Sequence, residues 1–344
     1  MSANPVLAEA SRGNSVENRH RGAAAIVDAS GTIIASIGDL NRPIFPRSAV
    51  KSMQALAIFT SGAWDQGLLD QRELALACAS HHGEAVHTEA VGALLAKLGL
   101  SENDLECGAH QPTNAAARRT LREKAEAPTQ LHNNCSGKHA GMLAVARALG
   151  IDPRGYVGID HPVQQEVRNA IEAVIGEPLT VDRCGTDGCS IPTFAAPLKS
   201  FAYGFARMAT GEGLEPRLAE ASQMLFDAAA AHPHLIAGTD HADTRLLGGF
   251  GNKLMQKSGA EGVQCGALRA KGWGYALKCD DGNLPASFAM LAGLLEAHAD
   301  LGEAQAEVLR DLKHQTLRNV RGIAVGEMRL AETFSSQWET RDGV

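Results

Sequence analysis

The sequence predicts an α+β fold, in which strands from the two ends of the chain form an antiparallel sheet. Two observations predict this class. Apolar runs suited to strands lie near residues 22–38 and again at 262–279 of the 344-residue chain. Between these regions the hydrophobic pattern is mostly helical, so strands and helices do not alternate as they would around a parallel sheet. The middle of the chain should therefore form a helical lobe.

The first part of the chain predicts a hairpin followed by helices. In residues 22–38 two apolar runs flank a short turn that contains Gly31. Pro43 and Pro46 then interrupt the chain. A helix should begin at Ser48, because proline disfavours a helix before it and serine suits a first helical turn. Helical patterns follow at about 71–79, 85–98, 102–106, 115–126, 138–149, 161–175, 191–208 and 215–231.

The last part of the chain returns to strands. Two strands, joined by Lys271 and Gly272, are expected at 262–270 and 273–279. The elements expected after them are helices at 284–298 and 302–316 and a strand at 321–330. We therefore expect one unit over residues 1–344. Its sheet part should cover about 20–45 and 235–344, and its helical lobe about 46–234.

Composition excludes several classes of function. The net charge is −7 and the isoelectric point is about 6.0, so no basic surface for nucleic acid is expected. No apolar stretch is long enough to span a membrane, and the first twenty residues lack the apolar core of a signal peptide. We therefore expect a cytoplasmic protein. Its seven cysteines should be reduced thiols, some of them metal ligands. No glycine-rich nucleotide-binding motif follows a predicted strand.

The segment from Ser48 to Lys51 predicts a serine–lysine pair. If a helix begins at Ser48, Lys51 lies one turn along on the same face. Lys51 is the only charged residue between Ser48 and Trp64. Burial in so apolar a helix should lower the pKa of the lysine, so that it can accept the serine proton. The alternative is a capping serine with a lysine in solvent, which is the usual meaning of an isolated Ser-x-x-Lys.

Two later segments strengthen the catalytic interpretation. Ser80 begins the run Ser-His-His-Gly-Glu, and Lys257 begins Lys-Ser-Gly shortly before a predicted strand. Serine acyl-transfer enzymes carry S-x-x-K, S-D-N and K-T-G in this chain order. Taken alone, the run at Ser80 would indicate a helix cap with surface histidines. Together the three segments predict a serine-dependent acyl-transfer enzyme.

These segments, with residues 132–142 and 182–189, resemble the rhizobial-type or class 3 L-asparaginases over nearly the whole chain. The resemblance implies a serine β-lactamase-like fold that is also related to serine-dependent glutaminases. It further implies a homodimer that hydrolyses L-asparagine, with strong preference over L-glutamine. The classical bacterial asparaginases fit less well, because their full threonine motifs do not occur in the sequence. No segment suggests the self-cleavage of the plant-type enzymes either.

The resemblance also implies residue roles. Ser48 pairs with Lys51, and Ser80 pairs with Lys257. Alternatives to Lys257 are its sequence neighbours, Lys253 and Lys271. Ser48 is the expected nucleophile, and backbone N–H groups at Ser48 and near Gly259 are expected oxyanion donors.

Three further residues are expected to contact the substrate. Arg47 suits the α-carboxylate of the amino acid, and Asp187 suits its α-amino group. His82 could add a hydrogen bond.

The resemblance also implies one zinc ion per chain, held by Cys135, Lys138 and Cys189. Three protein ligands would leave a fourth position for water. The spacing of the residues alone would favour His139 or Cys184 as the third ligand in place of Lys138. It is equally compatible with three ordinary buried residues that bind no metal. Two other interpretations remain at this stage. One is a glutaminase, a penicillin-interacting protein or another serine amidohydrolase, and the other is a non-enzymatic thiol-rich metal-binding or redox module.

Overall fold

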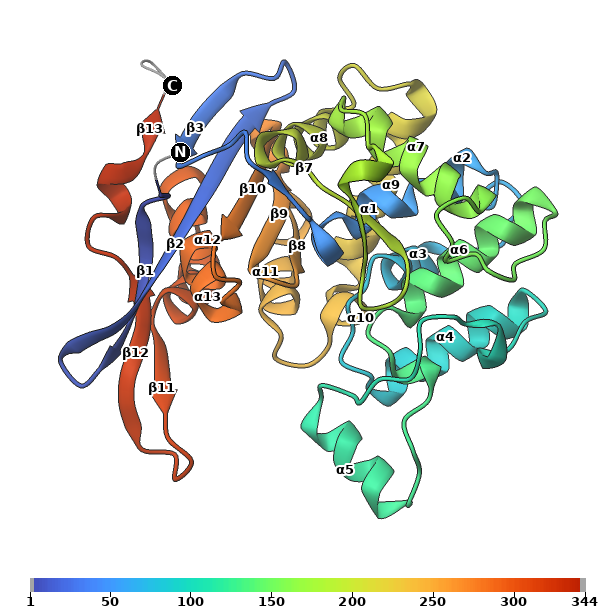
Figure 1. The fold of residues 1–344 in the computed structure, drawn as a ribbon, viewed down its shortest axis with the longest axis horizontal. Coiled ribbons are helices and arrows are strands. Elements are labelled where there is room, and N and C mark those ends of the chain that lie inside the picture. The colour runs from blue at the N-terminus through green and yellow to red at the C-terminus, as the bar shows by residue number, and fades with distance from the viewer. Residues whose placement is uncertain (1–2, 341–344) are drawn as a thin grey trace. The chain divides into compact units, whose positions relative to one another are not determined.

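The computed structural model describes residues 3–340, which divide into two compact units. The sheet unit consists of residues up to Ala49, residues Ala196–Thr210 and residues from Gln256 onward. The helical unit consists of Val50–Ala195 and Gly211–Met255. The predicted α+β class is confirmed, because the ends of the chain supply the strands and the middle supplies most of the helices (Figure 1). Within the described residues, no helix has both the length and the apolar character that crossing a membrane requires.

The sheet of the described residues has nine antiparallel strands, in the order β11-β12-β1-β2-β10-β9-β8, with β3 pairing with both β2 and β13. The strands are β1 Val6–Arg12, β2 Ser15–Asp28, β3 Ile33–Ile37, β8 Leu254–Gly259, β9 Val263–Leu268, β10 Trp273–Cys279, β11 Gln315–Arg318, β12 Ala324–Leu330 and β13 Glu339–Thr340. The predicted hairpin is β2–β3, and the predicted late strands are β9 and β10. Both ends of the chain therefore meet in one sheet.

The sheet extends further toward the N-terminus than predicted. It was expected to begin near residue 20, but β1 begins at Val6 and β2 at Ser15. The first half of β2 is mostly exposed and polar, so its sequence carries no apolar alternation. Residues 235–255, expected in the sheet part, lie mostly in helices of the helical unit, whereas residues 196–210 belong to the sheet unit. The predicted C-terminal boundary, residue 344, lies outside the described residues.

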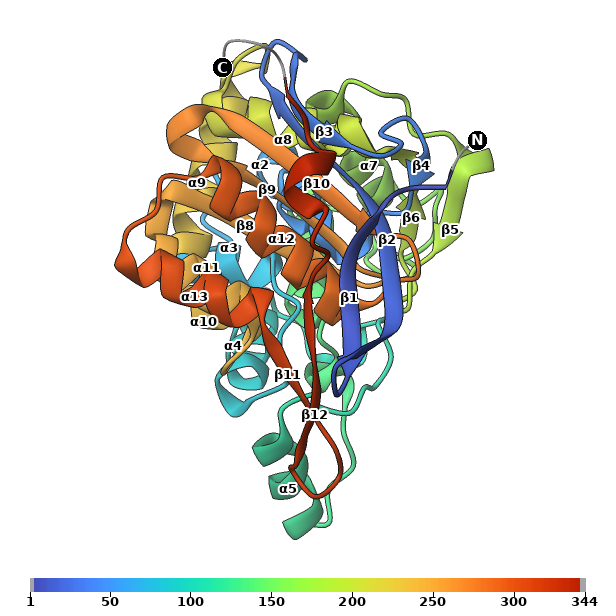
Figure 2. The same ribbon diagram turned by 90° about the vertical axis from the view of Figure 1, so that its left-hand side faces the viewer.

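Helices cover both faces of the sheet in the sheet unit. Helix α8, Leu198–Thr210, packs against β10 at Gly274, while α12, Leu284–His298, places Met290 beside Gly22 on the opposite face. Figure 2 shows α12 and α13, Glu303–Lys313, in front of β8 and β9. Helix α8 was predicted over 191–208, but its first residues instead form short strands. The remaining short elements of this unit are β4 Pro43–Ile44, β7 Ala196–Pro197, η6 Arg269–Lys271 and η7 Phe334–Gln337.

The helical unit contains the other α-helices of the described residues. They are α1 Lys51–Ala55, α2 Ala57–Thr60, α3 Gln71–Ala77, α4 Ala85–Lys97, α5 Ala115–Glu123, α6 Ser136–Leu149, α7 Pro162–Ile175, α9 Pro216–Ala231, α10 Pro233–Ala237 and α11 Ala242–Phe250. Its shorter elements are η2 Glu102–Asp104, η3 Gln130–His132, η4 Val181–Arg183, η5 Gly251–Lys253, β5 Cys184–Thr186 and β6 Pro192–Phe194. Most of the predicted helical segments are therefore present, with ends shifted by a few residues.

Helices α3 and α6 approach closely and carry the residues that matter for the site. Helix α3 begins with a capping box, in which Asp70 accepts from the backbone of Glu73 and Glu73 accepts from that of Asp70. In α6, Gly137 faces the backbone of Leu76, and a Cβ atom there would overlap the Leu76 carbonyl oxygen. The lack of a side chain therefore lets the start of α6 lie directly against the end of α3.

Candidate functional site

Ser48 lies in a short 3₁₀ helix, η1 Arg47–Val50, which leads directly into α1. The sequence predicts that the α-helix begins at Ser48, but it begins at Lys51. Arg47, just before the serine, has a φ of 52°. A left-handed conformation is unfavourable for an arginine and is found mainly where the surrounding structure enforces it, often near functional sites. Ser48 itself is half-buried.

The end of β8 lies against this turn within the sheet unit. A Cβ atom at Gly259 would lie 2.6 Å from the Pro46 carbonyl oxygen and 3.0 Å from the Ala49 nitrogen, so only glycine fits there. Lys257 is completely buried, and its Nζ donates to the Ser258 carbonyl oxygen at 2.8 Å. The structure thus brings the Lys-Ser-Gly segment next to the turn that carries Ser48.

Lys51 is buried, as predicted, with 1% of its surface exposed. Its Nζ donates to the Ser80 Oγ at 2.9 Å, to the Cys135 Sγ at 3.2 Å and to the Ala79 carbonyl oxygen. All these partners belong to the helical unit. The contact between Lys51 and Ser80 joins members of two different predicted pairs. The pairs themselves, Ser48 with Lys51 and Ser80 with Lys257, stay predictions.

The loop after α3 holds Ser80 in place. The Ser80 N–H donates to the Ile236 carbonyl oxygen at 2.8 Å, and the His81 N–H donates to the Asn134 carbonyl oxygen at 3.1 Å. His81 Nδ1 accepts from the Gly83 N–H, so His81 Nε2 donates to the Ser136 Oγ at 2.9 Å. His81 is therefore a buried structural residue and not a surface histidine.

Cys135, Lys138 and Cys189 form one buried cluster in the helical unit. Cys135 precedes α6, and its N–H donates to the Asn133 Oδ1 at 2.9 Å. Lys138 Nζ donates to the Cys189 Sγ at 3.0 Å, and the side chains of Cys189 and Cys135 are hydrogen-bonded to each other. The structure therefore gathers the three predicted metal ligands. We call them the thiol cluster.

The charges in the thiol cluster are strongly coupled. The hydrogen bond from Cys189, with the ammonium groups of Lys51 and Lys138, holds the pKa of Cys135 well below its usual value against the effect of burial. The same hydrogen bond and burial raise the pKa of Cys189. Burial alone would lower the pKa of Lys138, but the sulfur atoms of Cys189 and Cys135 raise it overall. The surroundings of Cys135 therefore favour its thiolate form.

The donor set of the thiol cluster fits a thiophilic cation. Two sulfur atoms and one amine nitrogen lie close together, and the surroundings favour the deprotonated form of Cys135. The two residues that spacing alone favoured lie elsewhere. His139 Nδ1 lies 2.6 Å from the Tyr156 hydroxyl, and the thiol of Cys184 donates to the Gly185 carbonyl oxygen.

The predicted substrate-binding residues lie in both units. Asp187, in the helical unit, is half-buried in the turn before Cys189, and its carboxylate contributes to raising the pKa of Lys138. His82 is half-buried and packs edge-on against His241, with ring centroids 5.1 Å apart. Arg47, in the sheet unit, precedes Ser48 and is also half-buried.

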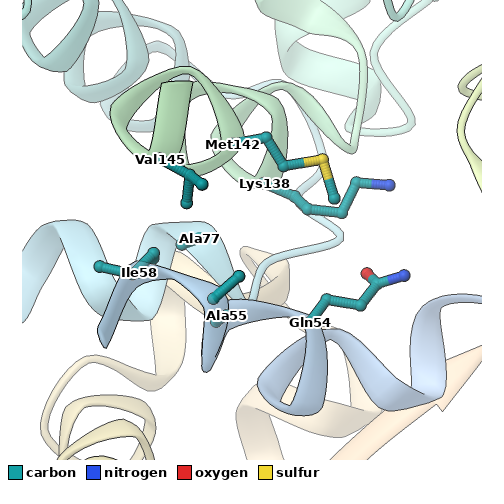
Figure 3. A pocket seen from close by; sticks show the side chains of 9 residues that line it. Gln54, Ala55, Ile58, Ala77, Lys138, Met142 and Val145 are labelled. Carbon is teal, nitrogen blue, oxygen red and sulfur yellow. The ribbon is translucent and has the colours of Figure 1, made fainter. Parts of the chain in front are cut away.

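A small cavity lies beside Lys138, between α1, α2, α3 and α6 (Figure 3). Its volume is about 10 Å³, which suffices for about one water molecule but not for an amino acid. Gln54 lines it, and the Gln54 Oε1 is buried with no hydrogen-bond partner among the described residues. A larger hollow of about 830 Å³ lies near α4, α5 and η3, lined by Gly83, Glu84 and His132 among others.

Sequence reasoning did not identify Asn133 as a site residue. Its side chain is buried, accepts from the Cys135 N–H and donates to the carbonyl oxygens of Cys107 and Gly108, both at 2.9 Å. Asn133 thus fixes the backbone that presents Cys135. The only signal in the sequence was its place in the His-Asn-Asn-Cys-Ser-Gly-Lys run, on which part of the resemblance depended.

Solved structures include remote likenesses to this chain. A β-lactamase from Mycobacterium bovis is 15% identical, with 80% of this chain and 94% of that chain covered and a TM-score of 0.44. A D-alanine carboxypeptidase AmpC from Burkholderia cenocepacia is 13% identical, with coverages of 85% and 93% and a TM-score of 0.38. Mglu in its native form is 17% identical, with coverages of 82% and 64% and a TM-score of 0.45.

The sequence comparisons give one family. No curated protein matches the chain. The L-asparaginase II family matches residues 8–330, which include both predicted serine–lysine pairs and all three residues of the thiol cluster. Because this match covers nearly the whole chain, and does not depend on the remote structural likenesses, the chain belongs to the L-asparaginase II family of amidohydrolases.

Proposed function

We propose that the protein is an L-asparaginase that hydrolyses L-asparagine to L-aspartate and ammonia through an acyl-enzyme. Membership of the L-asparaginase II family supports an amide substrate. The observation that carries the serine mechanism is the buried amine of Lys51, 2.9 Å from the Ser80 hydroxyl. A lysine held within hydrogen-bonding distance of a hydroxyl can exchange a proton with it.

In the proposed reaction, the Ser48 Oγ attacks the carbon of the side-chain amide while Lys51 accepts the serine proton. Backbone N–H groups of the turn at Ser48 and of the segment at Gly259 would stabilise the oxyanion. Ser80 and Lys257 would pass a proton to the departing nitrogen, which leaves as ammonia. Water then attacks the aspartyl ester, which releases L-aspartate and restores the Ser48 hydroxyl.

The substrate charges need partners as well. We assign Arg47 to the α-carboxylate, Asp187 to the α-ammonium group and His82 to an additional hydrogen bond. With both charged groups fixed, the longer glutamine would place its amide about an ångström or more from the nucleophile. Such a displacement costs on the order of a hundredfold in rate. We therefore propose strong selectivity for L-asparagine over L-glutamine.

Ser80 is the alternative nucleophile, because the structure places its Oγ against the Lys51 amine. Acid quenching during turnover, followed by mass spectrometry of peptides, would locate the aspartyl ester. The ester should lie on Ser48 and should be absent in Ser48→Ala. An ester on Ser80 in the wild-type protein would exchange the proposed roles of the two serines.

Ammonia release from a panel of amides tests the activity itself. L-Asparagine should be hydrolysed with aspartate as product, at a specificity constant roughly a hundredfold above that for L-glutamine. Ser48→Ala should reduce turnover by several orders of magnitude while the protein stays folded. Comparable hydrolysis of both amides would favour a glutaminase, and comparable hydrolysis of a chromogenic cephalosporin would favour a penicillin-interacting enzyme.

We also propose that the thiol cluster holds one zinc ion, through Cys135, Lys138 and Cys189. Bound there, zinc would supply a fixed positive charge for substrate placement. The chain's own residues prepare this site, since the Cys135 pKa is already lowered and Asn133 fixes the Cys135 backbone. Lys138 must lose a proton to serve as a ligand, so zinc affinity should fall as the pH is lowered.

Metal analysis tests this assignment independently of activity. Cys135→Ala and Cys189→Ala should each lose one equivalent of zinc and raise KM for L-asparagine. Cys184→Ala is the matched control, because Cys184 is also in the helical unit but its thiol is hydrogen-bonded to the Gly185 carbonyl oxygen and is not part of the thiol cluster. Zinc content equal to wild type in both cluster variants would contradict the site. The homodimer and the cytoplasmic location are proposed from the sequence alone.

A further inference from the structure

His20, Cys279 and Asp281 converge in the sheet unit, at the turn that joins β10 to α12. The His20 Nδ1 lies 2.7 Å from the Asp281 Oδ2, and the Cys279 thiol donates to the Asp281 Oδ1 at 3.0 Å. One ligand atom from each residue lies within 4.8 Å of the other two. His20 and Cys279 are buried, whereas Asp281 reaches solvent. None of the three has a role in the proposed hydrolysis.

We propose that His20, Cys279 and Asp281 form a second metal site, for a thiophilic divalent cation such as Zn²⁺. Imidazole, thiolate and carboxylate are all common zinc ligands, and three of them leave a fourth position for water. The exposed carboxylate gives the ion a route from solvent. A thiolate and a carboxylate together balance the charge of the cation.

The geometry requires only small movements. Around tetrahedral zinc, with ligand bonds of about 2.0–2.3 Å, neighbouring ligand atoms lie roughly 3.3–3.7 Å apart. The two short contacts would therefore open by about half an ångström, which the exposed Asp281 side chain can provide. His20 Nε2 has no partner among the described residues, whichever ring nitrogen carries the proton. If the ring proton moves from Nδ1 to Nε2, Nδ1 is free to bind the metal. The only hydrogen bond lost is the one from Nδ1 to Asp281, and the metal then links these two residues.

Proton release follows from this arrangement. The Cys279 thiol donates its proton to the Asp281 Oδ1, so this proton must leave when a sulfur–metal bond forms. Binding forms a sulfur–metal bond and transfers the thiol proton to solvent. One proton, from the Cys279 thiol, should therefore be released for each ion bound.

Asp281, and not the adjacent Asp280, faces His20 and Cys279. The adjacent Asp280 instead accepts from the Asn4 side chain at 3.0 Å and pairs with Arg42. The Asn283 N–H donates to the Asp281 Oδ1, and the Asn283 side chain caps α12. An ion here would join β2, the end of β10 and the start of α12, so binding should raise the melting temperature.

Cobalt titration of the full chain tests the proposal. The parent is Cys135→Ser/Cys189→Ser, which removes two ligands of the thiol cluster and so separates this test from the proposed function. Co²⁺ should bind at one equivalent, with a thiolate-to-cobalt absorption band, one proton released and a higher melting temperature. Adding Cys279→Ala or Asp281→Asn should weaken binding at least about tenfold and, for Cys279→Ala, abolish the band.

The matched control is Asp280→Asn, which removes the neighbouring carboxylate and should leave Co²⁺ affinity within about twofold. The proposal is overturned if the parent binds no Co²⁺, or if Cys279→Ala binds as well as the parent. An equal loss of Co²⁺ affinity in Asp280→Asn and Asp281→Asn would also overturn it, because this would indicate that the acidic groups attract the cation only through their charge. In the otherwise wild-type chain, Cys279→Ala should leave asparagine hydrolysis unchanged.

Discussion

Lys51 shows what residue patterns predict and what they miss. Its burial followed from the apolar segment around it, and the structure confirms this with 1% exposure. Its contacts with Ser80 and Cys135 could not be predicted, because those residues lie 29 and 84 positions away in the sequence. Local spacing reports which face of a helix a side chain occupies. It does not report which distant segment packs against that face.

Lys51→Met should inactivate the enzyme. The substitution keeps a long apolar side chain but removes the amine that contacts Ser80 and that accepts the Ser48 proton in the proposed reaction. Turnover should fall at least about a hundredfold, as is typical when a general base is lost. In the wild type, kcat/KM should rise with pH up to alkaline values, because a lysine must be neutral to act as a base.

The control for this variant is Lys97→Met, which removes a partly exposed lysine paired with Glu73. It should retain wild-type kinetics. A flat pH profile from about pH 5 to 9, or substantial turnover by Lys51→Met, would exclude lysine as the base.

The thiol cluster also shows that local spacing does not reveal which distant residue a side chain contacts. Spacing alone favoured His139 over Lys138, yet one step along α6 turns a side chain by about 100°. His139 therefore faces Tyr156, while Lys138 faces Cys189. Only the resemblance, which depended on the whole His-Asn-Asn-Cys-Ser-Gly-Lys run, selected the correct neighbour of Cys189.

At the scale of elements, the contact between α3 and α6 brings the helical-unit residues of the site together. Ser80 follows the end of α3, while Cys135 and Lys138 lie at the start of α6. Gly137 allows these two ends to meet at Leu76. The sequence predicted both helices, but not their closeness. A glycine inside a helix does not reveal which backbone approaches it.

Gly137→Ala should destabilise the protein and weaken zinc binding. The new Cβ would overlap the Leu76 carbonyl oxygen and force the helices apart. Overpacking typically costs about 1–3 kcal/mol, against a gain in helix propensity of about 1 kcal/mol. Because the overlap is with a backbone atom, we expect a cost in the upper part of this range and a net loss of up to about 2 kcal/mol in the free energy of unfolding, measured by urea denaturation.

Gly92→Ala is the matched control. Gly92 also lies inside a helix, α4, but a Cβ there would meet no atom within 4 Å. This variant should be stabilised by up to about 1 kcal/mol, the opposite sign to Gly137→Ala. Equal effects at both positions would show that helix propensity, and not the contact with α3, determines the outcome.

Strand prediction succeeded only where one face is strongly apolar. The buried half of β2, with β3, β9 and β10, carries such patterns and was predicted. The first half of β2 was missed because most of its residues are polar and exposed, and β1 was missed because three of its four buried residues are small, namely two alanines and a serine. Strand β8 was also missed, although all six of its residues are buried, because Gln256 and Lys257 interrupt its apolar run.

At the scale of the whole molecule, the order of elements was predictable, but the division into units was not. The chain enters the helical unit at Val50, returns to the sheet unit for α8, and leaves again at Gly211 until Met255. Helix α8 has the same local pattern as its neighbours. Only its long-range packing against β2, β9 and β10 assigns it to the sheet unit, and a sequence pattern carries no such information.

Global stability should depend on buried histidines of the helical unit. His81 stacks on His87 with ring centroids 4.8 Å apart, and His87 stacks on His234 at 5.5 Å. Burial, and then the nearby His87 and Lys51, hold the pKa of His81 well below its usual value. Burial also lowers the pKa of His87. The folded protein therefore keeps both rings neutral at a pH where the unfolded chain would protonate them.

Stability should therefore decline as the pH falls below about 6.5, the ordinary pKa of an unfolded-state histidine. A lowered folded-state pKa means that the unfolded chain binds more protons, so the stabilisation is complete above this pH and is lost toward the folded pKa values. Each ring contributes at most about 1.4 kcal/mol per pH unit in this window. Urea denaturation between pH 7.5 and 5.5 measures the change of the free energy of unfolding with pH.

His87→Gln should reduce this slope by up to about 1.4 kcal/mol per pH unit, which corresponds to one proton. His110→Gln, which removes an exposed histidine, should not change it. A stability that stays constant over this range would show that the buried rings do not control acid unfolding.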